Sequence, residues 1–224
     1  LEAARRGLVT AEMDSAARTE GVEAEYIRKA IEQGTVIITR NNRHTSIEGL
    51  AVGKGLKTKV NANIGSSQDH VDIEEELLKL RAAVEAGADA VMDLSTGGDV
   101  NAIRRAILAE SPVPIGTVPI YQAAIDAKKR GKSFVELTSD EMFDVIEQQA
   151  EEGVDFVTVH CGVTRGSVER VAREGRIMGI VSRGGALTAE WMKFQKKENP
   201  LYEEFPRLIE IAKKYDMVLS LGDG

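Results

Sequence analysis

Cysteine is almost absent from this 224-residue chain, which contains a single one, Cys161. One cysteine cannot form an internal disulfide, and it cannot by itself build a metal–thiolate site. Aromatic residues make up only 4% of the chain, which disfavours a surface for stacking nucleic-acid bases. The net charge of −7 points the same way, because nucleic-acid surfaces are basic. We therefore expect no nucleic-acid partner.

Long hydrophobic runs are also missing. No apolar stretch approaches the roughly 20 residues of a transmembrane helix, and the first residues lack the apolar segment of a secretory signal. We therefore expect a cytoplasmic protein without a membrane partner. The hydrophobic content of 42% is ample for the core of one large domain.

The chain does contain a series of short apolar runs that each end in polar residues. Such runs, separated by helical patterns, are typical of parallel strands that are buried on both faces. The sequence predicts strands in VNANIG (60–65), AVMDLSTGG (90–98), VPIGTVPIYQ (113–122), FVTVHCG (156–162), IVSRGGA (180–186) and VLSLGDG (218–224).

These six runs predict an α/β fold, a TIM-type (βα)8 barrel that is truncated after its sixth strand, because a closed barrel needs eight. The chain starts without Met and stops at a strand tip, which also indicates truncation. A doubly wound sheet is the rival, but it gathers ligand residues at one switch point. We expect residues 1–56 to form a small N-terminal subdomain and residues 57–224 the barrel units.

Helix signals alternate with these runs. Thr10 is expected to open a short helix, and residues 23–33 to form another. Asp72 is a plausible N-cap, and Thr138 with Glu141 forms a capping box.

The polar residues at the strand tips are candidates for binding and chemistry, because the carboxyl ends of barrel strands form the active site. His160 suits a general acid/base or an anion partner, although a lone strand histidine is often structural. Arg183, followed by two glycines, is the best phosphate candidate, with a structural ion pair as the alternative. Asn63 is either a ligand contact or a structural amide.

The sequence leaves the roles of the residues at two further strand ends undecided. Residues 93–98 could cradle an anion, or they could form an ordinary turn with Asp99 as the N-cap of the next helix. Tyr121 and Gln122 follow Pro119, which should project them out of the sheet. These residues indicate an enzyme for a small phosphorylated metabolite, and a non-catalytic phosphometabolite-binding barrel is the alternative.

Together, VNANIG, VMDLSTGG, SPVPIGTVPIYQA, HCGVTR, IVSRGGA, ENPLYEEF and LSLGDG resemble the family of phosphomethylpyrimidine synthase (ThiC) from about residue 57 onward. The resemblance implies a homodimeric barrel and an unusual radical S-adenosylmethionine (radical SAM) enzyme that rearranges 5-aminoimidazole ribotide. It also implies a [4Fe–4S] cluster, S-adenosylmethionine, a divalent metal (zinc or iron) and an external electron donor. The implied substrate contacts are Asn63, Met92, Tyr121, His160, Ser182, Arg183, Gly184 and Asp223.

The family's cluster cysteines and metal histidines have no counterpart in this sequence, so we expect them beyond Gly224, and we assign no catalytic residue or metal ligand here. Two departures could alter the substrate shell. IITRNNRH (37–44) replaces an IPxNxNH-like run, and Ala186 replaces the usual serine after Gly185. They favour the paralogue 5-hydroxybenzimidazole synthase of anaerobic cobamide biosynthesis. The alternative is phosphomethylpyrimidine synthase of thiamine biosynthesis.

Overall fold

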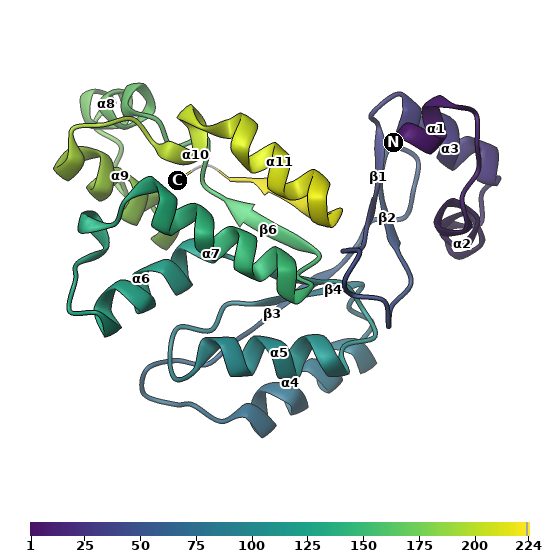
Figure 1. Ribbon diagram of the computed structural model, residues 1–224, viewed down its shortest axis with the longest axis horizontal. Helices are drawn as coiled ribbons and strands as arrows, with labels where there is room; N and C mark the ends of the chain where they lie inside the picture. Colours follow the sequence, from purple (N-terminus) through teal and green to yellow (C-terminus); the bar gives the residue numbers. More distant parts are fainter. Residues whose placement is uncertain (223) are drawn as a thin grey trace.

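The centre of the molecule is a parallel sheet. The computed structural model describes residues 1–222 and residue 224. Five strands lie in the order β3-β4-β5-β6-β7, and each is parallel to its neighbours (Figure 1). Their bounds are β3 (Asn61–Ile64), β4 (Ala90–Asp93), β5 (Ile115–Thr117), β6 (Phe156–Val159) and β7 (Val218–Leu221). The predicted α/β class is confirmed.

Helices follow the strands in alternation, as the sequence patterns predict. They are α4 (Ile73–Glu85), α5 (Val100–Glu110), α6 (Pro119–Lys129), α7 (Ser139–Glu152), α8 (Arg165–Glu174), α9 (Arg183–Gln195), α10 (Pro200–Glu203) and α11 (Phe205–Tyr215), with a 3₁₀ turn at Phe134–Glu136. The expected caps are confirmed, because Asp72 caps α4 and Thr138 forms a capping box with Glu141 on α7. None of the described helices is long and apolar enough to cross a bilayer.

The prediction of a strand at 180–186 is wrong, since Arg183 already begins α9. The Ser182 Oγ accepts the backbone N–H of Gly185 at 2.9 Å, which is the hydrogen bond of a helix N-cap. The apolar part of this run is only Ile180 and Val181, and Val181 is 59% exposed. A strong cap therefore outweighs a two-residue apolar stretch.

The end of the run 113–122 is also helical. Strand β5 stops at Thr117, and Pro119 occupies the first turn of α6, where its missing N–H costs no hydrogen bond. Tyr121 and Gln122 therefore lie on a helix that starts at the strand tip.

The two faces of the sheet differ in what covers them. Strand residues such as Val91, Ile115 and Val157 pack in one apolar core with side chains of α4, α5, α7 and α11. By strand alternation, the residues of opposite parity, including Asn63, Met92 and Thr158, belong to the other face. The sheet thus has one face packed against helices and another with more polar character.

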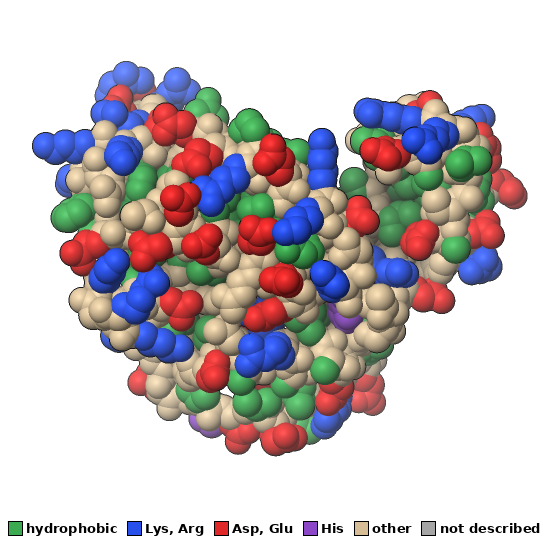
Figure 2. All heavy atoms as spheres, viewed as in Figure 1, with side chains coloured by type: hydrophobic (Ala, Val, Ile, Leu, Met, Phe, Trp, Pro, Cys, Tyr) green, Lys and Arg blue, Asp and Glu red, His purple; other side chains and the backbone are tan. Residues whose placement is uncertain are grey.

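The N-terminal part packs a core of its own. Helices α1 (Glu2–Arg5), α2 (Ala11–Glu20) and α3 (Ala24–Glu32) cover an antiparallel hairpin of β1 (Val36–Thr39) and β2 (Leu50–Gly53). Their shared cluster includes Met13, Ile27, Ile31 and Val36. Figure 1 shows these helices to one side of the sheet, and the space-filling view in the same orientation shows a protruding lobe at that place (Figure 2). A domain boundary after residue 56 stays a prediction.

Candidate functional site

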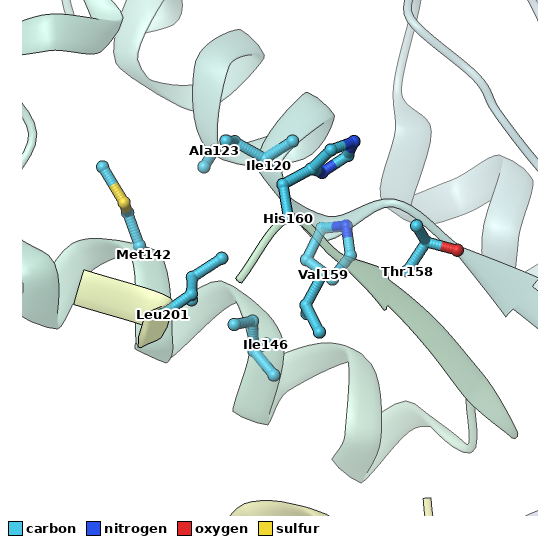
Figure 3. A pocket seen from close by; sticks show the side chains of 9 residues that line it. Ile120, Ala123, Met142, Ile146, Thr158, Val159, His160 and Leu201 are labelled. Carbon is cyan, nitrogen blue, oxygen red and sulfur yellow. The ribbon is translucent and has the colours of Figure 1, made fainter. Parts of the chain in front are cut away.

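His160 directly follows β6 and is buried, with 5% of its surface exposed (Figure 3). Two glycines approach its ring. A Cβ on Gly184 would lie 2.2 Å from His160 Cε1, and one on Gly222 would lie 3.7 Å from Cδ2. Asn199 fixes the backbone, because its Nδ2 donates to the carbonyl oxygens of His160 at 2.8 Å and Val163 at 2.9 Å. The structure thus joins His160 to Gly184, although the two are 24 positions apart.

Arg183 meets Tyr121 at the same edge. Its Cζ lies 5.4 Å from the centroid of the Tyr121 ring, a cation–π contact between the first turns of α9 and α6. Arg183 is exposed, and no ion pair joins it to a carboxylate within the described part of the chain. Both interpretations of Arg183, as a phosphate contact and as a structural ion pair, stay predictions. The neighbouring Ser182 hydroxyl is already used as the acceptor of the α9 cap.

Asn63 and Met92 are register partners on β3 and β4. Asn63 is exposed, and its Oδ1 accepts a hydrogen bond from Asn61 Nδ2 at 3.1 Å. Met92 is half-buried and packs against the apolar cluster that Tyr121 also borders. The same apolar cluster therefore links Met92 of β4 with Tyr121 of α6. Asp223 lies outside the described residues.

The loop at 93–98 has the structure of the ordinary turn. The Asp93 Oδ1 accepts the N–H of Ser95 at 2.9 Å, and Asp99 caps α5 through Asn101 N and Ala102 N, both at 3.1 Å. Burial raises the pKa of Asp93 above its ordinary value. The backbone N–H groups of Ala102 and Asn101 lower the pKa of Asp99. These three hydrogen bonds are those of an ordinary turn with Asp99 as the N-cap, and an anion-binding role of residues 93–98 stays a prediction.

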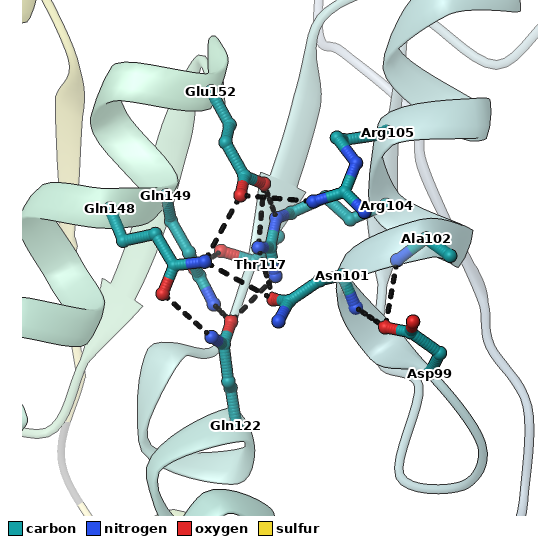
Figure 4. A network of polar contacts seen from close by, with 10 residues as sticks. All are labelled: Asp99, Asn101, Ala102, Arg104, Arg105, Thr117, Gln122, Gln148, Gln149 and Glu152. Carbon is teal, nitrogen blue, oxygen red and sulfur yellow. Dashed lines mark hydrogen bonds and ion pairs between the residues drawn. The ribbon is translucent and has the colours of Figure 1, made fainter.

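A buried polar network beside the site was not predicted from the sequence. It joins Arg104 of α5, Gln122 of α6 and Gln149 of α7 (Figure 4). Its members are widely separated along the chain, and no sequence signal links Gln122 with Arg104 or Gln149. Only packing of the three helices brings them together.

Comparison with known proteins decides the family. The sequence model described as the radical SAM ThiC family matches residues 1–224. The chain belongs to this family. It is 60% identical over 224 residues to a phosphomethylpyrimidine synthase of Syntrophus aciditrophicus and 59% identical over 225 residues to one of Geobacter metallireducens. A phosphomethylpyrimidine synthase of Moorella thermoacetica is 53% identical over 224 residues. Each alignment covers 100% of this chain and 52% of the relative, so the chain spans about half the length of these relatives.

The structure places the two segments that depart from the ThiC family pattern, residues 37–44 and Ala186, in different surroundings. The run at 37–44 lies at the amino ends of the strands, opposite the candidate site. Asn41 N donates to Asp155 Oδ1 at 2.8 Å, and His44 Nδ1 lies 2.7 Å from Asp155 Oδ2, just before β6 begins. Its polar groups bind the N-terminal part to the sheet, and the expectation that this run alters the substrate shell stays a prediction. Ala186 is exposed on the first turn of α9.

Membership of a radical SAM family implies S-adenosylmethionine and an iron–sulfur cluster. The described residues do not fit the cluster, which requires several thiolates. Cys161 is the only cysteine of the chain, it is buried, and burial raises the pKa of its thiol, which disfavours the thiolate. Within residues 1–222 and 224, no three His, Cys, Asp or Glu side chains are grouped to hold a metal.

Proposed function

We propose that this chain forms the substrate-binding part of a phosphomethylpyrimidine synthase, which rearranges 5-aminoimidazole ribotide with S-adenosylmethionine. The observation that carries this proposal is the identity of 53–60% over the whole chain with relatives of that name. These relatives favour the pyrimidine product over 5-hydroxybenzimidazole. Residues 37–44 contact Asp155 at the amino ends of the strands, away from the proposed site, which weakens one reason for the benzimidazole product.

Arg183 is the proposed phosphate-binding residue. A guanidinium can bind a phosphate with two hydrogen bonds, and the first turn of α9 places its positive helix end beside the same group. Tyr121 stacks on Arg183 and orients it. His160, whose ring lies close to Gly184, provides a ring nitrogen for a hydrogen bond to the ribotide. Asn63 provides an amide for the other end of the ribotide.

The remaining parts of the proposal concern the whole enzyme. The five parallel strands would be part of a (βα)8 barrel with these residues at its mouth. The [4Fe–4S] cluster, a zinc or iron ion, a homodimeric assembly and an external electron donor complete the proposed enzyme.

The test is to express the complete gene product anaerobically and reconstitute its cluster. It is then supplied with 5-aminoimidazole ribotide, S-adenosylmethionine and a reductant, and the products are separated by chromatography. We expect hydroxymethylpyrimidine phosphate. A fluorescent benzimidazole would contradict the proposed product, and ribotide binding without turnover would favour a non-catalytic binding protein.

A further inference from the structure

The buried network beside β5 is organised around a single charged side chain. Arg104 is 2% exposed. Its Nε and Nη2 donate to Glu152 Oε2 at 2.8 and 2.6 Å, and Nη2 also donates to Asn101 Oδ1 at 2.7 Å. Its Nη1 donates to Gln122 Oε1 at 2.6 Å. A buried charge is tolerated only when its hydrogen bonds are made, so removing a partner is costly.

The charge of Arg104 sets the direction of the hydrogen bonds that follow. A guanidinium can only donate, so the oxygen of the Gln122 amide must face it. The same oxygen accepts Gln149 Nε2 at 2.8 Å, which leaves Gln149 Oε1 to accept Thr117 Oγ1 at 2.5 Å. The Gln122 Nε2 donates to Gln148 Oε1 at 3.2 Å. The Gln122 amide is therefore held from α5 and α7, and through Gln149 it is linked to β5 (Figure 4).

Gln122 occupies the first turn of α6, next to Tyr121. The N-cap of α6 is Val118, which offers no side-chain cap, and the helix starts at Pro119. The network is thus a side-chain tether for a helix start that has no side-chain cap. Tyr121, one residue before Gln122, presents its ring to Arg183.

We propose that Gln122 is a positioning residue for ribotide binding. Through Arg104 and Gln149 it fixes the first turn of α6, so that the Tyr121 ring holds Arg183 in the orientation that receives the phosphate. This inference rests on the proposed function, because it requires Arg183 to bind the ribotide. Hydrogen-bond networks in a low-dielectric interior restrict orientation strongly, and small displacements of a binding group reduce its contribution.

The experiment compares ribotide affinity with stability in the complete gene product, using calorimetry for the dissociation constant and urea unfolding for stability. Gln122→Met removes every hydrogen bond of the amide at similar volume, and we expect it to weaken ribotide binding by about tenfold or more, a loss typical of a misplaced polar contact. Gln122→Glu keeps an acceptor oxygen toward Arg104 and is expected to retain affinity within about threefold. If Gln122→Met does not fold, Gln122→Asn withdraws the amide from Arg104 and takes its place.

The matched control is Asn41→Ala. Asn41 is fully buried and its Nδ2 donates to the carbonyl oxygens of Ala150 and Val154, so its loss also lowers stability. It lies at the opposite end of the strands, and we expect its ribotide affinity within about twofold of the wild type, since distant sites act independently. An equal loss of affinity in Asn41→Ala and Gln122→Met would reduce Gln122 to a stabilising residue and overturn the inference.

A double-mutant cycle tests the positioning role of Gln122 separately from ribotide binding by Arg183. In a Tyr121→Ala background, Gln122→Met should cause no further loss of affinity, because the side chain through which it acts is gone. Losses that multiply would overturn the positioning role. If Arg183→Ala and Tyr121→Ala both leave ribotide affinity unchanged, the proposed binding site is wrong. If Arg183→Ala weakens binding and Gln122→Met does not, only the positioning role fails.

Discussion

The two ends of the parallel sheet carry similar polar residues with different surroundings. At the amino end, Asp155 accepts the backbone N–H groups of Asn41 at 2.8 Å and Ile115 at 2.7 Å and also contacts His44 Nδ1 at 2.7 Å. At the carboxyl end, Arg183 is exposed and stacks on Tyr121. The polar groups around Asp155 at the first end bind the protein to itself, whereas the Arg183 side chain at the second end remains exposed.

This difference cannot be seen in the polarity of the residues alone. A buried polar group must find hydrogen-bond partners within the protein, so its presence is explained by stability. An exposed guanidinium at a helix start has no such requirement, because water can satisfy its hydrogen bonds. Stability therefore does not explain such a residue, and anion binding is the hypothesis to test. Substitutions at the two ends should therefore separate loss of stability from loss of affinity.

The largest effect is expected from Asp155→Ala at the amino end. The substitution leaves two buried backbone N–H groups without their acceptor, and loss of such a buried carboxylate should lower the free energy of unfolding by about 3–5 kcal/mol. Urea denaturation measures the change, with Asp144→Ala on the exposed side of α7 as the control. A loss below about 1 kcal/mol would show that this end does not anchor the N-terminal part.

Arg183→Ala should have the opposite profile. We expect ribotide binding to weaken by about 2–4 kcal/mol, as for a desolvated charge contact, while unfolding changes by less than about 1 kcal/mol. Calorimetry with the ribotide measures affinity. Arg173→Ala, on α8 with a side chain 74% exposed, is the control. Unchanged affinity in Arg183→Ala would place the phosphate elsewhere.

Gly184→Ala is expected to affect both properties, because the new Cβ would overlap the His160 ring. The ring or the start of α9 must move, at a cost of about 1–3 kcal/mol in stability and with a measurable loss of ribotide affinity. Gly166→Ala on α8 is the matched control, since its nearest neighbour, Thr164 Oγ1, would be 4.0 Å from the Cβ. Equal behaviour of the two variants would contradict the contact.

The smallest effect concerns pH. Burial raises the pKa of Asp93, so the folded protein holds this proton more tightly than the unfolded chain. The wild type should gain stability relative to Asp93→Asn as pH falls through the folded pKa, and lose that advantage as pH rises. Urea unfolding at pH 7 and pH 5 tests the sign. Asp99→Asn should differ in the opposite sense and at lower pH, because the lowered pKa of Asp99 stabilises the wild type at neutral pH and this advantage is lost only below the ordinary aspartate pKa of about 4. Urea unfolding at pH 5 and pH 3 tests it.

Much of the local structure could be predicted because it depends on neighbours in the chain. The caps at Thr10, Asp72 and Thr138 join a side chain to a backbone N–H three or fewer residues away, so residue type and spacing suffice. The predicted strand at 180–186 is wrong, as is the strand end at 119–122. At 180–186 a short apolar stretch competed with a serine cap, and the exposure of Val181 removed the burial that a strand would need.

The sequence by itself determined the family, the α/β alternation and the helix starts, because these follow from local spacing and from motifs within single segments. Only the tertiary structure decided which polar residues serve stability and which remain exposed. Arg183 was a candidate from its type and position, but its contact with Tyr121 appears only in the tertiary structure, and so does the contact of residues 37–44 with Asp155. The physical reason is that the role of a polar side chain depends on its hydrogen-bond partners and its burial. Both are set by segments that lie far apart in the chain.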